Sequence, residues 1–203
     1  VTGFRGELFD NFQWETFGQF SRVKTQDISR NDLNFDRVQQ ALFVVDGPNG
    51  QPICDPARNP DAGCVPWNIL GRTADGQSLV TQDAVDFVQG VGITVGETNQ
   101  RVVGGTIQGD FGRYGLTSPF AEDGVSALAG FEYRKDELER IPDDVSQIPG
   151  GRGLTGVGGG TLPVSGQVEV FELFMETQIP IVQDAPLIRE LSLSGAYRRS
   201  QYS

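Results

Sequence analysis

The stretch GFRGELFDNFQWETFGQFSRVKT, residues 3–25, alternates apolar and polar side chains on both sides of a short polar break. Phe4 and Leu8 share one face before the break, and Trp14 and Phe20 share one face after it. Period-two alternation is typical of a half-buried β-strand, and Asp10-Asn11 suits a tight hairpin turn. The stretch therefore predicts an antiparallel hairpin.

Two further pairs of segments repeat this pattern, residues 101–111 with 125–139 and residues 168–182 with 191–202. We therefore expect an all-β fold, an antiparallel meander of about six long strands. The connections within the pairs are short, whereas residues 27–92 and 141–165 form long connections between the pairs. Because short and long connections alternate, all short turns should lie at one end of the sheet and all long loops at the other.

The first long connection has a helical pattern of its own. Val38, Ala41, Leu42 and Val45 recur at helical spacing after a capping residue, Asn31 or Asn34. Residues 81–89 predict a second short helix. Residues 27–92 also contain nine Asp against four Arg, which makes this loop acidic.

Composition excludes several classes of protein. The chain of 203 residues has a net charge of −11, which argues against a nucleic-acid partner. It contains no histidine, so neither an imidazole base nor a His-ligated metal is available. The adjacent Asp143 and Asp144 are the nearest approach to a catalytic carboxylate pair, but nothing in the sequence sets their separation. We expect no enzymatic activity, cofactor or metal site.

The two cysteines of the chain, Cys54 and Cys64, lie in one proline-rich loop, ICDPARNPDAGCVPWNIL, residues 53–70. Two thiolates without histidine are too few ligands for structural zinc, and the spacing differs from the Cys-x-x-Cys of a redox pair. The sequence predicts a disulfide that staples the loop, which indicates an oxidising compartment.

The alternating strands fit two architectures. In a transmembrane β-barrel the apolar face meets lipid and the polar face meets a wet interior, and no long apolar run is needed. In a soluble β-sandwich the apolar face meets a second sheet. Alternation alone does not separate these two possibilities.

Several segments in this order resemble the β-barrel portion of TonB-dependent outer-membrane receptors of Gram-negative bacteria. They are the hairpin of residues 3–25, NFDRVQQALFVVD, the loop motif C…GCVPWNILG, DAVDFV, SALAGFEYRKDE, and VFELFMETQIPIV with LSLSGAYRRSQYS. The resemblance covers nearly the whole chain, residues 1–203. It implies a transmembrane β-barrel of about 22 strands in the outer membrane, with a long, helix-containing disulfide loop.

The resemblance also implies a function. Such receptors import a scarce ligand of the siderophore, cobalamin or oligosaccharide class, and the TonB–ExbB–ExbD complex energises the full-length receptor. The family's N-terminal plug and TonB-contacting segment have no counterpart here, and about six strands do not close such a barrel. We therefore expect a receptor fragment in which residues 27–92 and 141–165 are extracellular loops. The candidate ligand contacts are Asp55, Arg58, Asp61 and Trp67, with packing as the alternative role of Trp67. The alternative function is a secreted β-sandwich that binds a glycan or another ligand.

Overall fold

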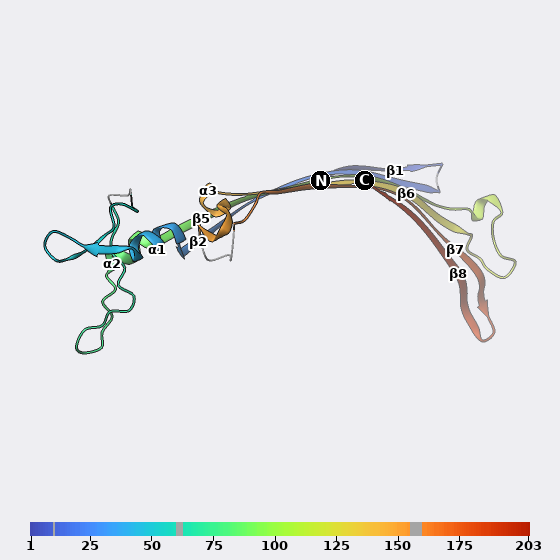
Figure 1. Ribbon diagram of the computed structural model, residues 1–203. Helices are drawn as coiled ribbons and strands as arrows, with labels where there is room; N and C mark the ends of the chain where they lie inside the picture. The colour runs from blue at the N-terminus through green and yellow to red at the C-terminus, as the bar shows by residue number, and fades with distance from the viewer. Residues whose placement is uncertain (10, 60–62, 155–159) are drawn as a thin grey trace. The chain divides into compact units, whose positions relative to one another are not determined.

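The computed structural model describes residues 1–9, 11–59, 63–154 and 160–203 (Figure 1). The elements, in chain order, are β1 (Thr2–Leu8), β2 (Phe12–Leu33), α1 (Phe35–Leu42), β3 (Val44–Asp46), β4 (Pro52–Cys54), α2 (Gln82–Val88), β5 (Gln89–Asp110), the 3-10 turn η1 (Gly112–Tyr114), β6 (Ser126–Pro142), α3 (Asp144–Gln147), the 3-10 turn η2 (Pro149–Gly151), β7 (Val164–Ala185) and β8 (Ile188–Tyr202).

The chain divides into two compact units. Unit 1 comprises Val1–Val23, Glu97–Leu138 and Ser165–Ser203, and unit 2 comprises Lys24–Gly96 and Glu139–Val164. The three short connections, after β1, β5 and β7, all belong to unit 1. The two long connections belong to unit 2. The short connections therefore all lie in one unit and the long connections in the other.

One six-stranded sheet contains most of the strand residues, in the order β1-β2-β5-β6-β7-β8. Consecutive strands of this sheet are neighbours, and Figure 1 shows β7 and β8, which a short turn joins, side by side. The pairs β1–β2 and β7–β8 are antiparallel, with Phe4 opposite Thr16 in the first hairpin and Met175 opposite Tyr197 in the last. The predicted antiparallel meander of about six strands is confirmed.

Several strands extend further than their apolar alternation predicted. β2 continues to Leu33 and β5 begins at Gln89, so the first long connection is shorter than 27–92 at both ends. β6 and β7 likewise narrow the second connection to residues 143–163. The end of β2 is mainly polar, whereas the start of β5 alternates Val91, Ile93 and Val95 with glycine and threonine. Ladder hydrogen bonds are made by backbone groups and do not require apolar side chains.

The two faces of the sheet in unit 1 differ in chemistry. A Cβ atom added at Gly105 would lie 3.2 Å from Thr16 Cγ2 and 3.0 Å from Phe131 Cε1, which assigns these three positions on β5, β2 and β6 to one face. This face, called the apolar face below, carries the even-numbered residues of β1 and β2 and the odd-numbered residues of β5, β6 and β8. On β7 it carries the odd-numbered residues up to the irregularity between Pro180 and Val182. The opposite face is called the polar face.

The apolar face is open to its surroundings in unit 1. Phe4 is 70% exposed, Phe20 62% and Leu193 59%, and among the described residues of unit 1 the buried aliphatic side chains are Val102 and Val170. Exposed apolar area of this extent marks an interaction surface rather than an ordinary solvated face.

Unit 2 has a small core made by its two helices and the second long connection. Asn34 Oδ1 accepts a hydrogen bond from the Arg37 amide and caps α1, and Thr81 caps α2 in the same way. Both predicted helices are therefore confirmed, with Asn34 rather than Asn31 as the cap. The helices bury Ala41, Ala84 and Val88 together with Leu154. No helix in the described ranges is long and apolar enough to cross a membrane.

Candidate functional site

The predicted disulfide is present between Cys54 and Cys64, whose Cα atoms lie 6.2 Å apart. Cys54 ends β4 and pairs with Val44 of β3, so one end of the stapled loop is anchored in the two-stranded sheet. The bond joins residues that are ten positions apart in the sequence. It restricts the chain between β4 and the segment that leads to Trp67.

Three of the four candidate ligand residues make contacts within the loop. The Arg58 Nε lies 3.6 Å from Asp55 Oδ2, and its guanidinium lies 4.5 Å from the centre of the Phe43 ring. Asp55 Oδ1 also accepts a hydrogen bond of 2.9 Å from the Ala57 amide. These contacts make Asp55 and Arg58 parts of the loop's internal structure. Asp61 lies outside the described residues.

Trp67 joins the stapled loop to α1, because its backbone amide donates to the carbonyl of Ala41 at 3.0 Å. Its indole Nε1 is buried, and in the part of the chain that the structure describes it has no hydrogen-bond partner. The backbone of Trp67 thus joins the loop to α1, and its indole nitrogen is buried. Both observations fit the packing role that the sequence offered as the alternative.

A hollow of unit 1 lies on the polar face. A cavity of about 630 Å³ is lined by residues from all six strands, mostly by alternate polar positions: Glu7, Gln13, Gln108, Asp110, Ser126, Glu176, Gln178 and Ser194. In a flat sheet the edge strands would be about 24 Å apart, because five spacings of about 4.8 Å separate them. One cavity that reaches from β1 to β8 therefore requires the sheet to curve toward its polar face.

Side-chain hydrogen bonds cross the strands on this concave face. Gln13 and Gln108 are joined at 3.2 Å, and Gln19, Gln100 and Asp136 form a chain with distances of 3.2 and 2.9 Å. Further along the sheet, Glu172 accepts hydrogen bonds of 2.6 Å from both Arg198 and Ser200. The face presents amides, hydroxyls and carboxylates, and these groups bind water, polar solutes or a polar protein surface.

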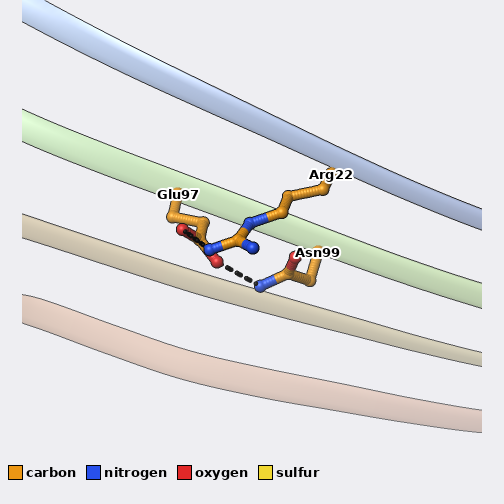
Figure 2. A network of polar contacts seen from close by, with 3 residues as sticks. All are labelled: Arg22, Glu97 and Asn99. Atoms are coloured by element: carbon orange, nitrogen blue, oxygen red, sulfur yellow. Dashed lines mark hydrogen bonds and ion pairs between the residues drawn. The ribbon is translucent and has the colours of Figure 1, made fainter.

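On the opposite face the apolar band ends at a row of charged side chains. Figure 2 shows Glu97 between Arg22 and Asn99, with Arg22 Nη2 2.6 Å and Asn99 Nδ2 2.9 Å from its carboxylate oxygens. Farther along the row, Lys135 Nζ lies 3.1 Å from both Glu137 and Glu169. Phe20 on β2 and Val103 on β5 are the last apolar residues of the apolar face before this row.

Asp143 connects β5 to the start of α3 in unit 2. Its Oδ2 accepts a hydrogen bond of 2.8 Å from the Ile93 amide, and its Oδ1 accepts one of 3.0 Å from the Ser146 amide at the start of α3. Partial burial raises the pKa of this carboxyl, but the hydrogen bonds from Ser146 and Ile93 outweigh burial and leave the pKa below its ordinary value.

Comparison of the chain with protein-family models, curated proteins and solved structures gives no match. Over the described ranges, no group of three or more Cys, Asp or Glu side chains is arranged to bind a metal ion. The sequence did not reveal the cavity of the polar face, although the alternation of Gln, Glu and Ser marked the residues that line it. The alternation did not indicate the curvature of the sheet, which brings these residues around one cavity.

Proposed function

We propose that the chain is a segment of the wall of an outer-membrane transport receptor, with its apolar face toward lipid and its polar face toward the interior of a β-barrel. The supporting observation is the combination of curvature and polarity. The polar face is concave around a cavity of about 630 Å³, and the apolar face remains exposed on the convex side. A membrane barrel needs this arrangement, because lipid surrounds it and water fills it.

The height of the apolar band supports a bilayer as its partner. On the apolar face the band runs from Phe12 to Phe20 on β2, and from Val103 on β5 to Phe111, the residue that follows β5, nine residues in each case. Nine residues extend about 30 Å along a strand, or about 21 Å along the membrane normal at a tilt of about 45°. The apolar band of outer-membrane barrels is about 25 Å tall, so the two heights agree.

The apolar face accounts for our preference over a soluble sandwich. A sandwich covers that face with a second sheet of comparable size. Apart from the six-stranded sheet, the described residues form only the two-stranded sheet of β3 and β4. Lipid would provide the missing cover.

In this proposal the two long connections face outward and contribute to capture of a scarce ligand of the siderophore, cobalamin or oligosaccharide class. The disulfide fits an oxidising location outside the cytoplasm. Transport itself belongs to the full-length receptor, whose partner would be the TonB–ExbB–ExbD complex. The segment carries the wall and the loops.

Neighbouring positions on one strand give a direct test. Both native cysteines are in the disulfide, so Met175→Cys on the apolar face and Glu176→Cys on the polar face each introduce one thiol for an environment-sensitive fluorophore. In vesicles of dimyristoylphosphatidylcholine, the label at position 175 should emit at shorter wavelength and resist quenching by iodide. The label at position 176 should behave as in water.

The experiment is repeated on β8 with Leu193→Cys on the apolar face and Ser194→Cys on the polar face. Identical, water-like emission at all four positions would contradict the proposal. A monodisperse, cooperatively unfolding monomer in buffer without detergent would contradict it as well.

A further inference from the structure

Unit 2 contains a second cavity, of about 570 Å³, where β2, α1, α2, the start of β5 and the second long connection meet. Val91, Val145 and Leu154 contribute apolar lining, and Arg30 and Arg37 contribute positive charge. An apolar wall with a small number of charged or polar groups is the usual composition of a site for a small organic ligand.

Beside this cavity the second long connection contacts the start of β5 and the start of α1. Leu154 is 5% exposed, and a Cβ atom at Gly90 or Gly92 would lie 2.3 or 2.7 Å from its methyl carbons. A side chain at either position would require the leucine to move. The amide of Phe35 donates to the carbonyl of Gly153 at 2.9 Å, which fixes the second connection to the start of α1.

The two arginines of the cavity differ from the other arginines in the first long connection. Arg58 pairs with Asp55, and Arg72 donates to the carbonyls of its own turn. Among the described residues, neither Arg30 nor Arg37 makes an ion pair. The Arg37 guanidinium donates a hydrogen bond to the carbonyl of Phe87 at 3.4 Å and lies 5.9 Å from the centre of its ring.

One carboxylate, that of Asp86, also lines the cavity, but it accepts a hydrogen bond of 2.8 Å from Gln82 Nε2. The cavity therefore combines two cations without counter-ions with one carboxylate that already has a donor. An excess of positive charge in the cavity is unusual within residues 27–92, which contain nine Asp and four Arg. It favours a ligand that supplies negative charge.

We infer that this cavity binds a small organic anion through Arg30 and Arg37, with the apolar part of the ligand against Leu154, Val145 and Val91. That such an anion is the class of ligand carried by the receptor rests on the proposed function. Anion binding itself does not.

The test uses 4-fluorobenzoate as the probe and 4-fluorobenzamide as its neutral analogue, both followed by ¹⁹F NMR with the whole chain in detergent micelles. The carboxylate should bind, and the amide should bind at least tenfold more weakly. Arg30→Gln and Arg37→Gln should each lower the affinity for the carboxylate on the order of tenfold, because each removes a charge-assisted contact. Arg30→Lys should retain part of the affinity, because it keeps the charge.

Arg72→Gln is the matched control, since Arg72 is in the same connection and does not line the cavity. Its affinity should equal that of the wild type. The inference is overturned if acid and amide bind alike, if neither arginine variant weakens binding, or if Arg72→Gln weakens binding as much as they do. Far-UV circular dichroism of each variant separates loss of a contact from loss of the fold.

The fluorophore experiment on β7 distinguishes failure of this inference from failure of the proposed function. Loss of anion binding with the expected lipid labelling overturns the cavity alone. Anion binding with water-like labelling at positions 175 and 176 retains the cavity but makes it the ligand site of a soluble module.

Discussion

Gly104 of β5 provides a quantitative test of how aromatic rings and glycines pair across the sheet. A Cβ atom at this position would lie 2.8 Å from both Cε1 and Cζ of Phe17 on β2, well inside van der Waals contact. The next nearest atom is the carbonyl oxygen of Phe131, at 3.3 Å. In Gly104→Ala the Phe17 ring must therefore move, and such overpacking costs about 1–3 kcal/mol.

A second substitution should remove most of this cost. In the Phe17→Ala background the ring is absent, and the nearest remaining atom to the new methyl group is the Phe131 oxygen, at 3.3 Å. Gly104→Ala should then cost less than about 1 kcal/mol, so the two substitutions should be strongly non-additive, as neighbours in contact are. Gly18→Ala on β2 is the matched control, because no atom lies within 4 Å of its added Cβ.

Urea unfolding in detergent micelles, followed by the emission of Trp14 in β2, measures these differences. A loss of about 2 kcal/mol lowers the midpoint by about 1 M when the slope is about 2 kcal/mol per M. Gly18→Ala should leave the midpoint within about 0.2 M of the wild type. Equal shifts for Gly104→Ala and Gly18→Ala, or an unchanged cost of Gly104→Ala after Phe17→Ala, would refute the reasoning.

Two further predictions concern unit 2. Replacing both cysteines by alanine should destabilise the stapled loop by about 3 kcal/mol, on the chain-entropy estimate for a closed loop of about ten residues. Hydrogen exchange at the Trp67 amide, which donates to Ala41, should then become faster, and unchanged exchange would contradict the role of the staple. Because the pKa of Asp143 is lowered in the folded protein, its contribution to stability is present above the ordinary carboxyl pKa, about 3.9, and is lost as the pH falls below it toward the folded pKa. Exchange at the Ser146 amide should accelerate over that acidic range in the wild type and show no such pH dependence in Asp143→Asn; equal profiles would exclude the carboxylate as the cause.

Local patterns were sufficient for the elements and the faces of the sheet. Period-two alternation placed Trp14 on the apolar face and Gln13 on the polar face, because successive side chains of a strand point to opposite sides. The cap of α1 was narrowed to Asn31 or Asn34, because a capping side chain binds an amide within its own first turn. Two cysteines in one short loop left the disulfide as the one chemistry available.

Other features depend on residues that are far apart in the chain and leave no local period. The end of β2 is mainly polar, so backbone pairing there gave no signal in the side chains. Asp143 accepts a hydrogen bond from the amide of Ile93, 50 positions earlier, and so links β5 to the segment that follows β6. The contact of Leu154 with Gly90 also joins separate connections.

The sequence alone determined an acidic, histidine-free, all-β chain with one apolar and one polar sheet face and a stapled loop, because strand periodicity and composition are properties of neighbouring residues. Only the tertiary structure decided that the polar face is the concave one, that Phe17 covers Gly104, and that Arg30 and Arg37 line one cavity without counter-ions. These properties arise from the curvature of the sheet and from the packing of one long connection on another, and both depend on contacts between distant segments.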